Sequence, residues 1–239
     1  GDQLGRVPVD LDHARDLALA RGLLPHGEPG RLTYERLVSD VDAFSALLRQ
    51  HGAGEEAKPR DVELDVDGVR LTARIPLLPR RRLLFARYAT IKARDRIRAW
   101  LTHLLLCASE APGADVHTAL IGRLPPTGFG GVAFTTAPGP LEQLAALLRM
   151  VVDGARAPLP FFPETSLAYA SSVSTGEDRD RAYGRALEAW EGPYGREGER
   201  ADPHFHQCFA GELPRGKAFE QAAESVYAAL LSNGEEVSA

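Results

Sequence analysis

The sequence has 239 residues and a mass of 25.9 kDa, with 44% hydrophobic residues, 26% charged residues and a net charge of −5. These proportions are those of an average globular protein and exclude a disordered or fibrous chain. No apolar run approaches the roughly 20 residues that a membrane helix needs, and the two cysteines are too few for a disulfide framework. Because the chain starts with Gly1 rather than Met, we expect a piece of a larger protein without a targeting segment, and the low cysteine count suits a reducing cytoplasm.

The acidic balance argues against a protein that coats nucleic acid generically, but the charge is unevenly placed. Residues 79–98 contain one acid, Asp95, and eight basic residues: Arg80, Arg81, Arg82, Arg87, Lys92, Arg94, Arg96 and Arg98. This segment therefore carries +7 on a body that carries −12. A local basic field of this kind is typical of a polyanion contact, although a solvated helix face next to a basic turn would give the same pattern.

The N-terminal half begins with helical patterns and then changes to strands. We expect a short helix over Leu11–Arg21, and a longer one over Tyr34–Leu48 with Thr33 as its N-cap. Alternation of apolar and polar residues then predicts two strands over residues 62–66 and 69–75, joined by a hairpin turn at Asp67-Gly68. A third antiparallel strand is expected over Leu83–Tyr88.

The C-terminal half alternates between helices and strands. An apolar stripe predicts a helix over Ile97–Ala108, with His103 off the stripe. The remaining expected elements are strands at Val116–Ile121 and Gly131–Thr136, a helix at Leu141–Val152, an extended turn at Pro158–Pro163, a polar linker at Ser171–Asp180, and helices at Tyr183–Trp190 and Phe219–Leu231.

This order of elements predicts an α/β (α+β) fold with a restriction-endonuclease-like core, in which helices flank a mixed sheet and additional helices follow at the C-terminus. We divide the chain into an N-terminal connecting segment (1–30), the nuclease-like core (31–155) and a C-terminal extension of short helices packed on the core (156–239).

Three short patterns resemble functional motifs, and each has a simpler interpretation. Residues 211–218 fit a phosphate-binding loop, but they end in Ala218 where the loop needs Ser or Thr, and Pro214 removes a backbone donor. Asp202, His204, His206 and Cys208 would share one face of a strand, yet the second ligand pair of a zinc site is missing. The acids Glu63, Asp65 and Asp67 occupy every second position, as residues on the solvent-facing side of a strand do. We therefore expect no metal site and no cofactor in this domain.

The predicted strands resemble those of PD-(D/E)XK nucleases, which hold Mg²⁺ through an acid at the end of the second strand and a D/E-x-K motif in the third. In this sequence Pro76 occupies the position of the first acid, Arg87 that of the second acid and Ala89 that of the lysine. Pro and Ala offer no ligand atom, and the permanently charged guanidinium of Arg would repel the metal ion. The resemblance therefore implies a nuclease-like domain whose three catalytic positions are degenerate.

Nearly the whole chain resembles the C-terminal domains of the RecC family, the gamma subunits of exodeoxyribonuclease V. The resemblance rests on the segments 22–27, 69–75, 84–108, 158–163 and 189–192, and on Asp202-Pro203 before Phe205. It implies a domain that helps to hold the partner subunit RecB, contacts the incoming duplex and contributes the pin that separates its strands. RecD would be the third subunit, and ATP and Mg²⁺ would act in the partner subunits.

From these observations we expect a non-catalytic domain that contacts a DNA end or fork, with the eight basic residues of the segment 79–98 meeting phosphates and no membrane contact. Two alternatives remain open from the residues alone. One is an active metal-dependent nuclease with displaced carboxylates, for which Glu63, Asp65 or Glu35 are candidates. The other is a protein-interaction module whose basic segment meets an acidic surface of RecB.

Overall fold

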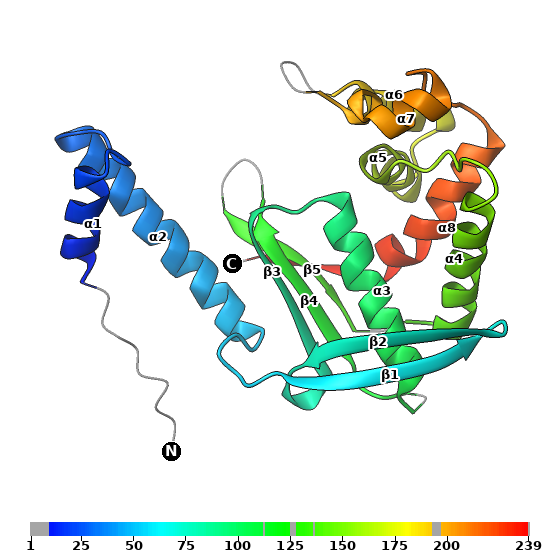
Figure 1. The fold of residues 1–239 in the computed structure, drawn as a ribbon, viewed down its shortest axis with the longest axis horizontal. Helices are drawn as coiled ribbons and strands as arrows, with labels where there is room; N and C mark the ends of the chain where they lie inside the picture. Colours follow the sequence, from blue (N-terminus) through cyan, green and yellow to red (C-terminus); the bar gives the residue numbers. More distant parts are fainter. Residues whose placement is uncertain (1–9, 112, 125–127, 136, 193–196, 239) are drawn as a thin grey trace.

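The computed structural model describes residues 10–111, 113–124, 128–135, 137–192 and 197–238. It has an α+β fold in which helices flank a mixed sheet (Figure 1), and this confirms the predicted fold class. The elements are α1 (Leu11–Ala20), α2 (Glu28–Gln50), β1 (Lys58–Val66), β2 (Val69–Leu77), the 3-10 turn η1 (Pro79–Arg81), β3 (Arg82–Thr90), α3 (Ala93–Ser109), β4 (His117–Arg123), β5 (Phe129–Phe134), α4 (Pro140–Gly154), α5 (Pro163–Ser174), α6 (Arg179–Glu191), η2 (Glu199–Ala201), α7 (Pro203–Phe209), α8 (Lys217–Asn233) and β6 (Gly234–Ser238).

The main sheet has four strands in the order β3-β4-β5-β6. Strand β3 is parallel to β4, so the chain must cross over between them, and α3 makes this crossover on one face of the sheet. Strands β4, β5 and β6 then pair antiparallel in succession. The predicted strand over Gly131–Thr136 corresponds to β5, although Thr136 itself lies outside the described residues.

Strands β1 and β2 form the predicted hairpin, in which Val66 pairs with Val69. Asp67 and Gly68 have positive φ values of 51° and 77°, as a type I′ turn requires. The expected set of three antiparallel strands is wrong, however, because β3 belongs to the main sheet and pairs with β4, and only an isolated bridge from Leu78, the residue after β2, to Arg82 joins the hairpin to β3 among the described residues. The left-handed turn residues that precede β3 redirect the chain, so the hairpin forms a separate sheet across one end of the main sheet (Figure 1).

The main core lies where α3 packs between the sheet, the hairpin and helices α4 and α8. Its largest side chains include Trp100 of α3, Phe134 of β5 and Tyr227 of α8, all almost fully buried. His103 was expected off the apolar stripe, but it is fully buried, and one ring nitrogen lies 2.9 Å from the hydroxyl of Thr118 on β4. A polar partner on the sheet therefore allows a histidine on the buried face of the helix.

The C-terminal extension contains three elements that sequence patterns missed or misassigned. Helix α5 occupies part of the predicted polar linker at Ser171–Asp180, and β6 adds a strand to the main sheet. The predicted strand through Asp202 and Cys208 is the short helix α7, because the side chain of Asp202 accepts a hydrogen bond from the backbone N–H of His204 and Pro203 occupies the first turn. A second aromatic cluster around Phe162 and Trp190 joins α5, α6 and α8. The boundary at residue 156 stays a prediction.

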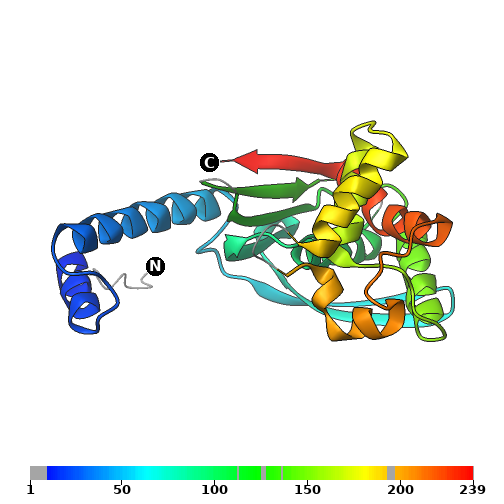
Figure 2. The same cartoon turned by 90° about the horizontal axis from the view of Figure 1, so that it is seen from above.

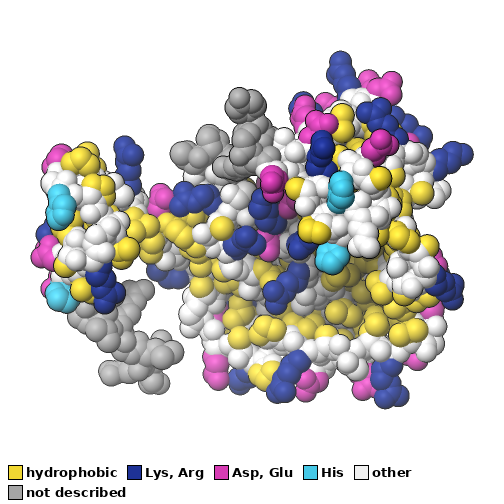
Figure 3. All heavy atoms as spheres, turned by 45° about the horizontal axis from the view of Figure 1, so that its top comes forward, with side chains coloured by type: hydrophobic (Ala, Val, Ile, Leu, Met, Phe, Trp, Pro, Cys, Tyr) yellow, Lys and Arg dark blue, Asp and Glu magenta, His cyan; other side chains and the backbone are white. Residues whose placement is uncertain are grey.

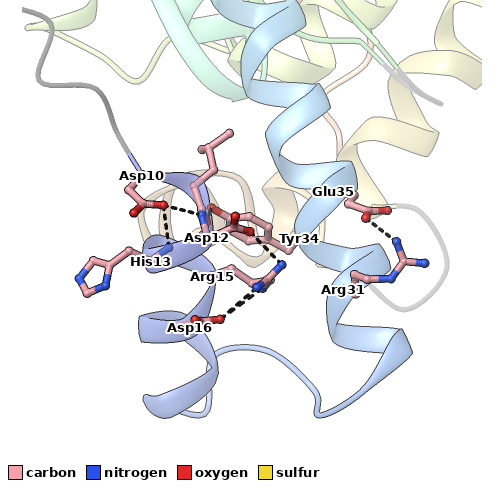
Figure 4. A network of polar contacts seen from close by, with 9 residues as sticks. Asp10, Asp12, His13, Arg15, Asp16, Arg31, Tyr34 and Glu35 are labelled. Carbon is pink, nitrogen blue, oxygen red and sulfur yellow. Dashed lines mark hydrogen bonds and ion pairs between the residues drawn. The ribbon is translucent and has the colours of Figure 1, made fainter.

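Helices α1 and α2 form an arm that leaves the body of the molecule (Figures 1 and 2). Helix α2 begins five residues before the predicted N-cap, so Thr33 lies inside it and donates its hydroxyl hydrogen to the carbonyl oxygen of Pro29. The C-terminal part of α2 packs on β4 and β5 through Phe44 and Leu47, in an apolar cluster that is separate from the main core. At its far end Tyr34 donates a hydrogen bond to the carbonyl of Leu11, which fastens α1 to α2 (Figure 4). None of the described helices is long and apolar enough to cross a membrane.

The pairing of β4 with β5 leads to a stability prediction at Gly131. A Cβ atom at this position would lie 1.7 Å from the carbonyl oxygen of Leu120, a backbone atom that cannot move aside. We expect Gly131→Ala to lower the free energy of unfolding by about 3 kcal/mol or more, as overpacking does in a tight core. Chemical denaturation followed by circular dichroism would measure this change.

The matched control is Gly184→Ala in α6, where a Cβ atom would meet nothing within 4 Å. It should raise the free energy of unfolding by about 0.5–1 kcal/mol, because Ala is the better helix former. Equal stabilities of the two variants would contradict the observed register of β4 and β5.

Candidate nucleic-acid interface

The basic segment of residues 79–98 is divided in space by strand β3. The turn Pro79–Arg81 precedes this strand, whereas Lys92 and helix α3 follow it. A strand from Arg82 to Thr90 is about 26 Å long, at roughly 3.3 Å per residue. One basic run in the sequence therefore becomes two separate basic surfaces, which we call the turn surface (Arg80, Arg81, Arg82) and the helix surface (Lys92, Arg94, Arg98).

In the turn surface, two of the three arginines are bound to carboxylates. Arg81 donates to Glu110 at 3.0 Å, and Glu110 also forms an ion pair with Arg60 at 3.0 Å. Arg82 forms an ion pair with Glu55, and its Nε–H donates to the carbonyl oxygen of Pro79. Arg80 has a left-handed backbone with φ of 58° and an exposed side chain, so it points its charge into solvent.

The helix surface lies near the end of β3 and along the first two turns of α3. Arg87 contributes less charge to it, because both carboxylate oxygens of Asp95 accept hydrogen bonds from its guanidinium, at 3.0 and 3.2 Å. Arg98 lies over the ring of Phe85, with 5.9 Å between the guanidinium carbon and the ring centroid. Lys92 and Arg94 are exposed. Among the described residues, no carboxylate lies within ion-pair distance of Arg80, Lys92, Arg94 or Arg98.

Arg96 differs from the other seven basic residues, because it turns inward. Its side chain is half-buried beside Glu236 and Leu230 in a small cavity of about 220 Å³. Desolvation by burial lowers the pKa of Arg96, while the nearby charges of Glu164 and Glu236 oppose this shift. Arg96 therefore serves the packing of α3 against α8 and β6 rather than an outer surface.

The N-terminus of α3 is not a free anion site. The backbone N–H of Ala93 donates to the carboxylate of Glu164 on α5 at 3.0 Å, and the N–H of Lys92 donates to Asp95 at 2.9 Å. These carboxylates occupy the place that a phosphate would take at a helix N-terminus. Any polyanion contact here would therefore involve the side chains of α3 and not its backbone donors.

The three degenerate catalytic positions lie on strands of two different sheets. Pro76 lies on β2, two residues before the isolated bridge Leu78–Arg82, whereas Arg87 and Ala89 lie on β3, with Arg87 five residues beyond the same bridge. The nearest acid to Arg87, Asp95, is engaged by its guanidinium. Within the described parts of the chain, no group of three or more His, Cys, Asp or Glu side chains is arranged to hold a metal ion.

The displaced carboxylates of the nuclease alternative lie on separate elements. Glu63 forms an ion pair with Arg70 across the hairpin at 3.2 Å, and Asp65 accepts a hydrogen bond from the N–H of Gly68. Glu35 lies far out on the arm, where it contacts Arg31 (Figure 4). All three of these side chains are exposed, as the alternation of the strand predicted for Glu63 and Asp65.

The other two short motifs also have structural roles. The N–H of Gly216, which a phosphate-binding loop would direct at its ligand, donates to the hydroxyl of Tyr183 at 2.8 Å. This loop follows helix α7 and not a strand. His204, His206 and Cys208 are exposed on α7, where His204 and Cys208, as positions i and i+4, share one face of the helix and His206 faces away from them.

Sequence reasoning missed the partners that neutralise the basic segment. Glu55 and Glu110 come from a loop and a helix end more than 25 residues away in the sequence, so no local signal links them to Arg82 and Arg81. Asp95, by contrast, lies inside the segment, and its distance of eight residues from Arg87 spans the turn between β3 and α3.

Comparison with known proteins shows the family to which this domain belongs. The family model of the RecC C-terminal domain matches residues 2–174, so the chain belongs to the RecC C-terminal domain family. The RecBCD enzyme subunit RecC of Mycolicibacterium smegmatis (strain ATCC 700084 / mc(2)155) is 30% identical over 169 residues, which are 69% of this chain. The chain spans only about 15% of the length of that relative.

The geometry around Arg87 leads to a prediction about hydrolysis. Arg87→Asp would place a second carboxylate beside Asp95, but the positions of Pro76 and Ala89 still supply no ligand atom. We expect neither the original chain nor this variant to degrade linear DNA with Mg²⁺ or Mn²⁺. The variant should lose about 1 kcal/mol of stability or less, because the ion pair that it breaks is partly exposed.

A gel assay of linear duplex DNA, with and without EDTA, would measure cleavage, and thermal melting would verify that both proteins are folded. Metal-dependent cleavage that copurifies with the folded chain would establish the nuclease alternative instead.

Proposed function

We propose that this chain is the non-catalytic C-terminal domain of a RecC subunit, which contacts DNA and scaffolds RecB within a RecBCD helicase–nuclease (exodeoxyribonuclease V). The complex would act at double-stranded DNA ends or forks in double-strand-break repair by homologous recombination, in the bacterial cytoplasm, with RecD as third subunit. The observation that carries the proposal is the exposure of unneutralised basic side chains at both ends of β3, in a chain of the RecC C-terminal family.

The chemistry of these side chains suits phosphates rather than bases. Arg80, Lys92, Arg94 and Arg98 lie on a turn and on the outer face of a helix, from which they can meet a phosphate backbone without entering a groove. The turn surface and the helix surface are separated by about the length of β3, which corresponds to roughly eight base pairs of duplex at 3.4 Å each. One duplex lying along β3 could therefore contact both surfaces.

The ion pairs between arginines and carboxylates separate the eight predicted phosphate contacts into stronger and weaker candidates. Arg81, Arg82 and Arg87 would have to exchange an ion pair for a phosphate, and Arg96 is half-buried. We therefore assign the larger share of phosphate binding to Arg80 and the helix surface. ATP and Mg²⁺ would act in the partner subunits, and we propose no cofactor for this domain.

The helix surface leads to a prediction about salt dependence. The double variant Arg94→Gln and Arg98→Gln should weaken binding to forked DNA and flatten the slope of log K against log salt by about 2, because each lost phosphate contact removes about 0.9. Fluorescence anisotropy of a labelled fork between about 50 and 200 mM NaCl would measure both effects.

The matched control is the double variant Arg181→Gln and Arg185→Gln, which removes the same charges at the same spacing from α6. An equal loss of fork affinity in both double variants would show that net charge, and not the helix surface, determines binding.

The turn surface leads to a separate prediction. Arg80→Gln should reduce the salt slope of fork binding by about 1, as expected for one phosphate contact. Arg70→Gln, on the exposed side of the hairpin, is the control for a single lost charge. The same titrations would measure both variants, and an unchanged slope for Arg80→Gln would remove the turn from the interface.

A further inference from the structure

An open apolar groove lies between helices α3 and α4 and has no role in the proposed DNA contact. It has a volume of about 620 Å³, and its two helical walls carry Ile97, Leu101 and Leu105 on one side and Leu148 and Val151 on the other. The end of the groove is formed by Leu159 and Phe161, in the segment before α5. Figure 3 shows a hollow in which hydrophobic side chains gather, with Lys and Arg side chains beside it.

The groove is not covered by any part of the chain that the structure describes. Val151 is 69% exposed, although it lies on the same face of α4 as the buried Leu144. Apolar side chains that gather in a concave surface and remain open to water mark a binding site more often than scattered surface residues do. The exposed wall therefore fits a partner that shields it.

The charges beside the groove indicate which partner fits. On α3, Arg94 and Arg98 share the helical sector of Leu101 and Leu105 and lie toward the N-terminal end of this wall. No carboxylate among the described residues neutralises either of them. On α4, in contrast, Arg149 already forms an ion pair with Asp67. The α3 edge thus carries an uncompensated positive charge next to an apolar wall.

We propose that this groove binds an amphipathic helix of another protein chain, which presents leucine-type side chains to the groove and Asp or Glu to Arg94 and Arg98. Helix-in-groove recognition requires apolar anchors at i, i+3, i+4 and i+7, and charges at the rim that set orientation. The lining residues run from Ile97 to Leu105 on α3 and from Leu144 to Gly154 on α4, about 12–15 Å at roughly 1.5 Å per residue, so the groove accommodates about two to three turns of a bound helix.

This inference does not depend on DNA binding, although Arg94 and Arg98 take part in both. Val151 distinguishes the two, because it lines the groove and carries no charge. A variant at Val151 should affect the helix partner and leave fork binding unchanged, whereas the two arginines should affect both.

The test uses the 239-residue chain and two labelled synthetic peptides of about 18 residues, which form a helix of roughly 27 Å. Both peptides carry leucines at the spacing of one helical face; one has glutamates beside that face, and the other has lysines. We expect the glutamate peptide to bind at least tenfold more tightly by fluorescence anisotropy. Reversal of the charge at the rim of the groove, by Arg94→Glu with Arg98→Glu, should make the lysine peptide the tighter binder.

Val151→Asp should weaken the glutamate peptide at least tenfold, while Val152→Asp, on the neighbouring position outside the groove, should change it less than twofold. Failure of both peptides to bind, or equal binding after Val151→Asp, would overturn the proposal. So would a dimer that sedimentation detects in the original chain and that Val151→Asp abolishes, because a second copy would then occupy the groove. If a small apolar dye binds the chain and competes with neither peptide, this result would also count against a helix bound in the groove.

Discussion

The burial of helix α3 is the interaction on which the rest of the structure depends. Trp100 and Leu104 on this helix contact the sheet, and the same core includes Phe134, Leu144 and Tyr227 from three other elements. Because β3 and β4 are parallel, a crossover of this kind is required, and α3 fills it with a helix whose one face is apolar. The burial of these side chains fixes where the outer face of α3 points.

The fixed position of α3 separates the charges of the basic segment into different environments. Arg96 shares the inner side of the helix and is half-buried, whereas Arg94 and Arg98 lie on the outer side. Asp95 binds Arg87 and closes the N-terminus of the helix, with help from Glu164 of α5. The outer face of α3 therefore offers both free positive charge and, further along, an unshielded apolar wall.

These two properties support two different kinds of contact on one helix. Phosphate binding depends on charge that solvent and salt can reach, so it should respond to ionic strength. Helix binding depends on apolar area, which salt affects much less. The proposed DNA contact and the proposed groove partner therefore share the rim of α3 but differ in the force that dominates each of them.

The sequence by itself determined the elements with a strong period: the hairpin with its Asp67-Gly68 turn, strand β3, helix α3 and the order that defines the α+β class. It also located the basic segment, since charge can be counted without a fold. Only the tertiary structure decided that β3 leaves the hairpin and pairs with β4, that β6 completes the sheet, and that Glu55 and Glu110 neutralise part of the charge. The physical reason is range: periodicity and turn chemistry act within a few residues, whereas strand pairing and ion pairs join residues that the sequence keeps far apart.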